Sequence, residues 1–514
     1  MAIKTFAAID VGSFVMNLKI YEMSGKNGMR QIDDIRHRLD LGSDTYALEK
    51  ISYENVNELC NILKEFKNIM QTYKVSAYKA CGTSAIREAL NTKILLDHIS
   101  QRTGIQIDVL SNSEQRFMNY KAVAYKTDEF NRILEQDTAI LDIGGGSIQL
   151  SLFEKGTLTT TQNMRLGVLR LQERLMHLNA SSMKMEELID EMITSQLSVF
   201  KKMYLKDREI KNIIVVDDYL AGVLQKHTMD GKHFGYMKVK DYFDFQKDIH
   251  NKTVTEIAES LNIARESAGL LYISATLVKQ TARMMGADLL WAPGVSLCDG
   301  IAYEYGEQNK IFHAEHDFEA DIITSAEHIS KRYMGSKKRS ETLEKIALTI
   351  FDSMKKVHGL GKRERLLLQL ATLLHDCGKY ISLVNLGECS YHIIMSSEII
   401  GLSHREREIV ANVVQYNHLP FEYFDSWGSR TTLDAEAYLV IAKLSAILKV
   451  ANGLDRSHKQ KFKNVKTTLK ERELMIQVDT AEDITLEKGL FTQRADFFEE
   501  VYNIRPIIKQ KKTL

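Results

Sequence analysis

One strand-and-turn pattern occurs twice in this chain, about 130 residues apart. The first copy is Thr5-Phe-Ala-Ala-Ile-Asp10-Val-Gly12-Ser13, and the second is Thr138-Ala-Ile-Leu-Asp142-Ile-Gly144-Gly-Gly146-Ser147. In each copy an apolar run ends in Asp, one apolar residue and Gly, and an alternating segment follows, so each copy predicts a β-hairpin. Two such units predict a duplicated α/β domain. The alternative is a coincidence between two common strand-turn patterns.

The second turn contains three consecutive glycines. Because glycine has no Cβ, its backbone can take φ > 0 and press its N–H groups against a ligand. Asp142, at the end of the apolar strand, is placed to bind a metal or a metal-bound water beside that ligand. The pattern therefore predicts a phosphate-binding hairpin, whereas the plainer interpretation is a tight hairpin turn.

Two further segments offer candidate site residues. Thr83 and Ser84 follow a strand and open a helix, whose free N–H groups make an anion site. Arg87, one turn later, can add a bidentate phosphate contact, although capping alone explains the Ser and Thr equally well. Glu114 lies in the first turn of another helix, either complementing the helix dipole or aimed into a cleft. Its position alone favours the first role.

The character of the chain changes near residue 305. Before it, strands and helices alternate, which is typical of α/β architecture. After it, strand signals vanish and long helical patterns predict a separate all-α domain. The predicted domains are 1–130, 131–305 and 306–514. The helical part carries an adjacent His375-Asp376 pair and a basic run, which predicts a solvated face or a path for a polyanion and comprises Lys459, Lys461, Lys463 and Lys466.

Charge and cysteine content narrow the function class. The chain has 68 Lys and Arg against 68 Asp and Glu, so no global field favours nucleic acid or an acidic membrane surface. The N-terminal residues lack a signal-peptide pattern, and no apolar run has the length of a membrane span. Five scattered cysteines without a CxxC pair predict reduced thiols in a cytoplasmic protein.

Taken in order, the motifs resemble those of the exopolyphosphatase/guanosine pentaphosphate phosphatase (Ppx/GppA) family. They are Asp10-x-Gly12-Ser13, Thr83-Ser84-Ala85-x-Arg87-Glu88-Ala89, Asp142-Ile-Gly-Gly-Gly-Ser147 and Leu166-Gly167-x-x-Arg170-Leu171. Leu-Leu-His375-Asp376-x-Gly378 and Leu-Asp455-Arg-Ser-His458 resemble the HD-like domain of the long members. The resemblance implies two actin-like (ribonuclease H-like, ASKHA) α/β domains around a cleft, followed by an all-α HD-like domain.

The resemblance also implies a function and a site. The expected reaction is hydrolysis of a terminal phosphate from inorganic polyphosphate, or of the 5′ γ-phosphate of guanosine pentaphosphate, with Mg²⁺ held through water by Asp10 and Asp142. Glu114 matches the family's catalytic glutamate and would act as general base on the attacking water. A homodimer is implied by analogy. The phosphate-binding positions are Gly12, Ser13, Ser84, Arg87, Gly144, Gly145, Gly146 and Ser147. Arg165, Arg170, Arg265 and Arg283 are candidates for contacts to a longer chain or for structural salt bridges.

The sequence departs from the family pattern in three places. Gln149 replaces a carboxylate of the catalytic set, and an amide can orient a water but cannot take a proton or bind Mg²⁺ as a carboxylate does. The Gly-rich turn of the second domain is replaced near Asp217-Asp218-Tyr219. In the helical domain the expected first histidine is Arg339 and the late aspartate is Asn452, so pairing of His375 with Asp376 inside the packing is the preferred interpretation. A second hypothesis follows, in which the protein is a catalytically weakened polyphosphate or alarmone sensor.

Overall fold

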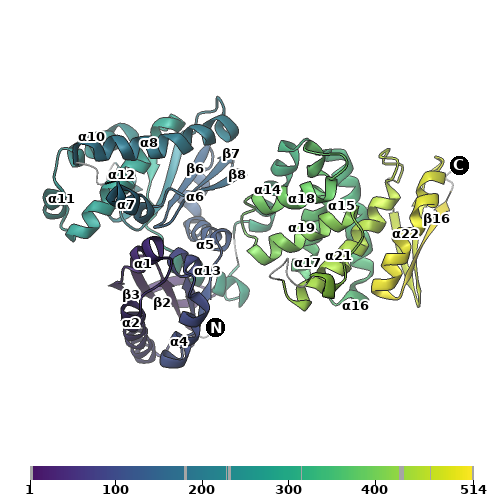
Figure 1. Cartoon of the computed structure of the whole chain (residues 1–514), viewed down its shortest axis with the longest axis horizontal. Coiled ribbons are helices and arrows are strands. Elements are labelled where there is room, and N and C mark those ends of the chain that lie inside the picture. Colours follow the sequence, from purple (N-terminus) through teal and green to yellow (C-terminus); the bar gives the residue numbers. More distant parts are fainter. Residues whose placement is uncertain are drawn as a thin grey trace. The chain divides into compact units, whose positions relative to one another are not determined.

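A computed structural model of the chain describes residues 4–178, 182–226, 228–229, 233–313, 315–427, 433–462 and 465–511, and the account below is confined to them. The chain separates into two compact units, Met1–Phe318 and Glu319–Leu514 (Figure 1). Each unit is described by itself. The first unit contains two α/β parts, each a β-sheet covered by helices, whereas the second unit is helical over most of its length.

The first sheet is built on the hairpin that ends at Asp10. Its strand order is β3-β2-β1-β4-β5, and the strands are β1 (Lys4–Val11), β2 (Val15–Ser24), β3 (Gly28–Arg38), β4 (Ala77–Gly82) and β5 (Ile107–Val109). β1 pairs antiparallel with β2 and parallel with β4. Alternate residues of β1 therefore point to opposite faces. One face packs on α2 (Tyr53–Thr72) and α4 (Thr92–Thr103), and the other packs on α5 (Asn112–Ala124) and α13 (Leu297–Gln308).

The second sheet repeats this arrangement around Asp142. Its order is β12-β13-β9-β6-β7-β8, and the strands are β6 (Thr138–Ile143), β7 (Ile148–Glu154), β8 (Thr157–Met164), β9 (Asn212–Asp217), β12 (Tyr236–Lys238) and β13 (Leu289–Trp291). β6 pairs antiparallel with β7 and parallel with β9, as β1 does with β2 and β4. The predicted duplication of an α/β unit is thus confirmed.

Apolar helices cover one face of the second sheet. They are α7 (Val168–His177), α8 (Ser182–Phe200) and α12 (Arg265–Met285) (Figure 1). α11 (Val254–Leu261) and α12 are separate helices, because Asn262 adopts φ 53° and ends α11. The remaining elements of the first unit are α1 (Leu41–Leu48), α3 (Ser84–Glu88), α6 (Thr127–Ile133), a π-helix (Lys201–Leu205), α9 (Ala221–Leu224), β10 (Thr228–Met229), β11 (His233–Phe234) and α10 (Val239–His250).

The second unit packs its helices around α21 (Ala435–Leu454) (Figure 1). Among the described residues, α21 is the one helix long and apolar enough to cross a membrane, and most of it is buried inside the unit. The other helices are α14 (Phe318–Arg332), α15 (Lys337–Ser353), α16 (Lys355–His358), α17 (Lys362–Leu374), a 3₁₀ helix (Cys377–Tyr380), α18 (Leu386–Ser396), α19 (His404–His418), α20 (Phe424–Trp427) and α22 (Thr485–Tyr502).

The expectation that the last domain is entirely helical is wrong for its final segment. β14 (Val465–Lys470), β15 (Glu473–Asp479) and β16 (Arg505–Lys511) form a three-stranded sheet in the order β14-β15-β16. Alternate residues of β15 are buried, namely Leu474, Ile476 and Val478. The period-2 pattern of β15 spans only seven residues, and β14 carries Lys466, which the sequence pattern assigned to the basic run.

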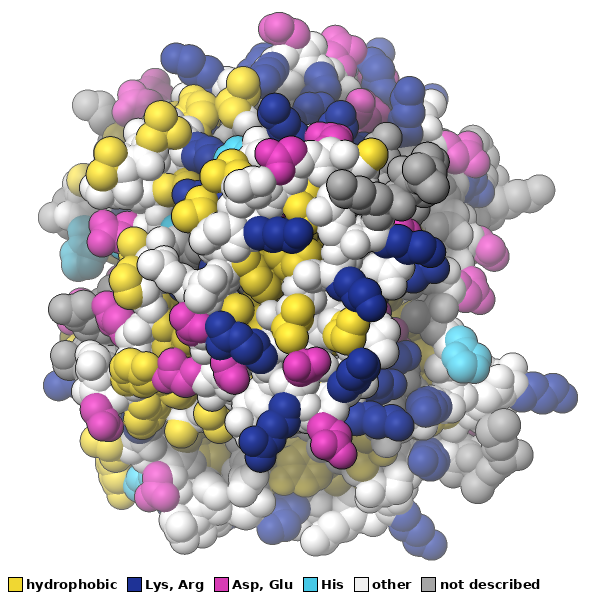
Figure 2. Space-filling view, turned by 90° about the vertical axis from the view of Figure 1, so that its right-hand side faces the viewer, with side chains coloured by type: hydrophobic (Ala, Val, Ile, Leu, Met, Phe, Trp, Pro, Cys, Tyr) yellow, Lys and Arg dark blue, Asp and Glu magenta, His cyan; other side chains and the backbone are white. Residues whose placement is uncertain are grey.

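The basic run therefore divides between two structural roles. Lys461 forms an ion pair with the buried Glu487 at 3.0 Å, whereas Lys466 lies exposed on β14. Lys463 lies outside the described residues. Figure 2 views the molecule from the side on which β16 lies in Figure 1, and Lys and Arg side chains are spread over this face among acidic and apolar ones.

Candidate active site

The two equivalent hairpins bring their Asp-Gly turns to one narrow cavity between the sheets of the first unit. Its volume is about 50 Å³. The predicted residues that line it are Asp10, Gly12, Ser13, Ser84, Asp142, Gly144 and Gly145. Residues about 130 positions apart in sequence meet here because each aspartate lies one residue before the end of a central strand of its own sheet.

Asp142 is held by two side chains of α5. Arg116 forms an ion pair with Asp142 Oδ1, and Asn119 Nδ2 donates to Asp142 Oδ2 at 2.7 Å. Arg116 Nη2 also donates to the carbonyl oxygen of Ser147 at 2.8 Å. Burial raises the pKa of Asp142, and the Arg116 guanidinium opposes that shift. Both carboxylate oxygens of Asp142 are therefore engaged by protein groups.

The triple-glycine turn is supported from behind by the Leu166-Gly167-x-x-Arg170 motif. The N–H of Gly144 donates to the carbonyl oxygen of Ser147 at 3.0 Å and closes the turn. A Cβ on Gly167 would lie 2.2 Å from the backbone of Gly146, so the close approach requires glycine there. Arg170 Nε donates to the carbonyl oxygen of Gly146 at 2.9 Å. Arg170, a candidate chain contact, thus braces the turn.

Three hydroxyl groups meet beside the glycine turns. Ser84 Oγ lies 2.9 Å from Ser13 Oγ and 2.9 Å from the Tyr46 hydroxyl, and Ser13 Oγ lies 3.3 Å from Tyr46. A hydroxyl is both donor and acceptor and can rotate toward a ligand. Ser13 and Ser84 also line the cavity, so they can exchange these mutual bonds for bonds to phosphate oxygens.

Five predicted residues do not line the cavity. Arg87 donates to the carbonyl oxygen of Leu110 at 2.6 Å, because its guanidinium is directed to the loop before α5. Glu114 Oε2 accepts from the N–H of Ser111 at 2.9 Å and closes a capping box. Gln149 is buried and lies 3.4 Å from Ser151 Oγ. Gly146 and Ser147 complete the turn itself. The catalytic role of Glu114 stays a prediction.

The cavity is also lined by residues that were not predicted for the site, among them Arg116, Asn119, Asp217 and Asp218. The spacing of the first two, three positions apart on α5 just after Glu114, places them on one helix face and was a usable signal. Burial raises the pKa of Asp217 to about 7, although its carboxylate accepts from Ser274 and from the N–H groups of Tyr219 and Leu220. Burial and the neighbouring Asp218 raise the pKa of Asp10.

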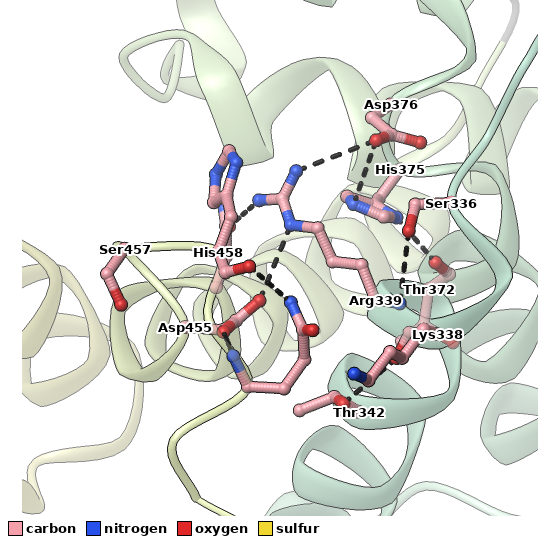
Figure 3. A network of polar contacts seen from close by, with 12 residues as sticks. Ser336, Lys338, Arg339, Thr342, Thr372, His375, Asp376, Asp455, Ser457 and His458 are labelled. Atoms are coloured by element: carbon pink, nitrogen blue, oxygen red, sulfur yellow. Dashed lines mark hydrogen bonds and ion pairs between the residues drawn. The ribbon is translucent and has the colours of Figure 1, made fainter. Parts of the chain in front are cut away.

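In the second unit an arginine lies where the resemblance places a metal ligand. The Arg339 guanidinium points between Asp376 and Asp455 (Figure 3), with Nη1 3.5 Å from Asp376 Oδ2 and Nε 3.6 Å from Asp455 Oδ2. Its Nη2 donates to Asn452 Oδ1 at 2.9 Å. No group of three or more metal-binding side chains occurs in the described part of the chain. Arg339 therefore places one positive charge between these two carboxylates, and Lys379 adds a second at 3.1 Å from Asp376 Oδ2.

His375 makes the second unit sensitive to acid. Its Nδ1 lies 2.8 Å from the carbonyl oxygen of Thr372 in a fully buried setting, and burial lowers its pKa to about 3. The unfolded chain, with a pKa near ~6.5, binds more protons than the folded chain below pH ~6.5, so stability falls as the pH is lowered. We expect His375 alone to lower the free energy of unfolding by about 2 kcal/mol at pH ~5 relative to pH ~7.

Urea unfolding of Trp291→Phe, which leaves Trp427 as the fluorescent reporter of the second unit, measures this effect at both pH values. Adding His375→Asn should remove the share of the pH dependence that His375 contributes and leave the share of His418, whose pKa burial lowers to about 4. His404→Asn, at an exposed position, should leave the pH dependence unchanged. Equal free energies of unfolding at the two pH values would contradict the prediction.

Family models match both units. The model described as Ppx/GppA phosphatase family matches residues 20–305, and that described as Ppx/GppA phosphatase, domain III, matches residues 323–495. Over 434 residues the chain is 21% identical to a guanosine-5′-triphosphate,3′-diphosphate pyrophosphatase of Vibrio atlanticus, covering 80% of each protein. It is 26% identical over 144 residues to exopolyphosphatase 1 of Mycobacterium tuberculosis, covering 28% of this chain and 40% of that protein.

Solved structures share the fold of the first unit. The Aquifex aeolicus member of the Ppx/GppA family matches with a TM-score of 0.50 at 18% identity, covering 62% of this chain and 100% of that one. An exopolyphosphatase from Cytophaga hutchinsonii matches with the same score and identity, covering 60% of this chain and 100% of that one. The α/β architecture described above is therefore shared with proteins that are only 18% identical in sequence.

Proposed function

The chain belongs to the Ppx/GppA phosphatase family, and from this premise we propose that it hydrolyses the terminal phosphate of inorganic polyphosphate or the 5′ γ-phosphate of guanosine pentaphosphate. The names of the relatives from Mycobacterium tuberculosis and Vibrio atlanticus support these two substrates. The observation that carries the proposal is the meeting of two equivalent Asp-Gly hairpins at one cavity.

The phosphate would be held by groups that need no rearrangement of the backbone. The turns at Gly12 and Gly144 line the cavity, and the N–H groups of these two glycines close the turns on the carbonyl oxygens of Val15 and Ser147. The side-chain donors beside the turns are the hydroxyls of Ser13 and Ser84. Fixed donors around a phosphoryl group stabilise the negative charge of its transition state, which is the main contribution that a protein makes to phosphoryl transfer.

The donor set fits Mg²⁺. Asp10 Oδ1 is buried and has no hydrogen-bond partner among the described residues, and hard carboxylate oxygens suit Mg²⁺, which keeps several waters and takes one or two protein carboxylates. Asp10 is the carboxylate placed to hold the ion. Asp142, whose oxygens accept from Arg116 and Asn119, would contact it only through water. When bound, Mg²⁺ neutralises charge on the phosphate being transferred.

Glu114 would act as the general base once its carboxylate leaves the N–H of Ser111. Glu114→Gln separates its two roles, because an amide oxygen can still accept from Ser111 but cannot take a proton. We expect phosphate release to fall about 10²-fold with unchanged thermal stability. Glu256→Gln alters a similar capping box on α11, and is the matched control.

The measurement is phosphate release with Mg²⁺ from long-chain polyphosphate and, separately, from guanosine pentaphosphate. Release by the wild-type chain from either compound supports the proposed function. If Glu114→Gln releases phosphate as fast as wild type, Glu114 is only a cap. Tight binding of both compounds without release would instead identify a sensor, which the buried Gln149 and the capped Glu114 favour.

A further inference from the structure

Asp218 occupies the turn where the second sheet meets the cavity. It follows Asp217, the last residue of β9, whose carboxylate is fixed by Ser274 and by the N–H of Leu220 at 2.8 Å. Asp218 itself is solvent-accessible and lines the cavity that contains Asp10 and Asp142. It also lines an adjoining cavity of about 470 Å³, so its carboxylate lies at the junction of the two.

Asp218 has no bonding partner in the described part of the chain, and its nearest cations are already paired. Lys19 binds Asp299 at 2.8 Å, Arg36 binds Asp34 at 3.1 Å, and Arg116 binds Asp142. Asp10, which lines the same cavity, also makes no hydrogen bond or ion pair there. Two carboxylates from different sheets thus line one cavity, and neither forms an ion pair of its own among the described residues.

The wall beside them holds further unsatisfied groups. Asn119 is 7% exposed, its Nδ2 is committed to Asp142, and its Oδ1 is buried without a partner among the described residues. Arg116 is 3% exposed and its Nε is unpartnered in the same way. A buried polar atom left without a partner is destabilising, so this wall is built to meet a ligand. Asn119 Oδ1 is suited to accept a hydrogen bond from the water shell of a cation, and the Nε–H of Arg116 is suited to donate to an anion.

Residue 149 is a glutamine, so it does not supply the carboxylate that the family pattern has at this position. Gln149 lies directly opposite Asp142 in the β6–β7 pair, is 3% exposed and does not line the cavity. Resting on the proposed function, we propose that Asp218 is the second carboxylate of a divalent-cation site, that it faces Asp10, and that it provides the negative charge absent at Gln149. Asp142 then serves chiefly to fix Arg116 and the glycine turn.

The test measures cation binding without substrate. Mn²⁺ serves as the probe, and its binding to the full chain is followed by electron paramagnetic resonance in wild type, Asp218→Asn and Asp248→Asn. Asp248 is an exposed residue of α10 and controls for the loss of one negative charge. We expect Asp218→Asn to weaken Mn²⁺ affinity at least ~10-fold, because a hard cation prefers a carboxylate to an amide, while Asp248→Asn matches wild type. Both variants should unfold at the wild-type temperature.

Equal Mn²⁺ affinity in wild type and Asp218→Asn, including unmeasurable binding in both, would overturn the assignment of Asp218. Phosphate release by the wild-type chain is scored separately. Release together with equal Mn²⁺ affinities removes Asp218 from the site but keeps the proposed function. Weaker binding by Asp218→Asn in a chain that releases no phosphate supports the cation site and overturns the hydrolysis.

Discussion

Replacing Asp10 with Asn is expected to lower phosphate release about 10³-fold without destabilising the first unit. Asp10 lies one residue before the end of β1, and its Oδ1 is buried without a hydrogen-bond partner among the described residues. Burial and Asp218 raise its pKa, which means that the folded protein disfavours the charge on Asp10. Removing that charge therefore costs no stability and adds about 1 kcal/mol or less.

The two effects are measured on the same preparations. Phosphate release is followed at saturating Mg²⁺, and urea unfolding is followed by the fluorescence of Trp291 in a Trp427→Phe background. Asp108→Asn is the control, because Asp108 lies exposed on β5 of the same sheet and outside the cavity. Unchanged release by Asp10→Asn would contradict a catalytic role. A loss of several kcal/mol in its free energy of unfolding would show that the carboxylate is structural.

The sequence was sufficient for the parts of this site that depend on local pattern. Asp10 and Asp142 end apolar strands, and glycines follow at fixed spacing, so period-2 alternation and turn chemistry predicted both hairpins. The roles of Arg116 and Asp218 depend on contacts between segments distant in sequence. Nothing near Arg116 shows that its guanidinium will meet Asp142 on another element.

Glu114 shows a different limit of sequence reasoning. The position of Glu114 predicts a first-turn carboxylate that complements the helix dipole, and the structure shows a more specific role, a capping box with Ser111. The family resemblance assigns the same side chain a catalytic role, and both interpretations are compatible with the residues. The local sequence pattern around Glu114 shows only that the side chain can stabilise the end of a helix. A catalytic role depends on the substrate that binds in the cleft. Only substitution can separate the two.

Arg339 shows how one side chain can meet two buried carboxylates. Asp376 lies between α17 and the 3₁₀ helix, Asp455 directly follows α21, and the guanidinium lies within 3.5–3.6 Å of both. An arginine side chain cannot lose its charge at ordinary pH, so one positive charge stays between them. The sequence identified Arg339 at this position but did not indicate that it would form ion pairs with Asp376 and Asp455. The second unit is thereby organised by an ion-pair network.

The Arg116–Asp142 pair is the contact whose loss should be most damaging to the first unit. Arg116→Met leaves Asp142 buried without its cation, and Asp142→Asn leaves Arg116 buried without its anion. Each change is expected to lower the free energy of unfolding by about 3–5 kcal/mol, because an unpaired buried charge keeps its desolvation cost. Arg116→Met also removes the donor to the carbonyl oxygen of Ser147, so phosphate release should be lost with it.

The double variant Arg116→Met/Asp142→Asn distinguishes this explanation from simple loss of packing. It removes both charges, so its destabilisation should be smaller than the sum of the two single changes by at least ~1 kcal/mol. Phosphate release should remain absent, because the carbonyl oxygen of Ser147 still lacks its donor from Arg116. Strict additivity of the two changes in urea unfolding would show that the residues act independently. In that case the ion pair between Arg116 and Asp142 does not stabilise the packing of the glycine turn against α5.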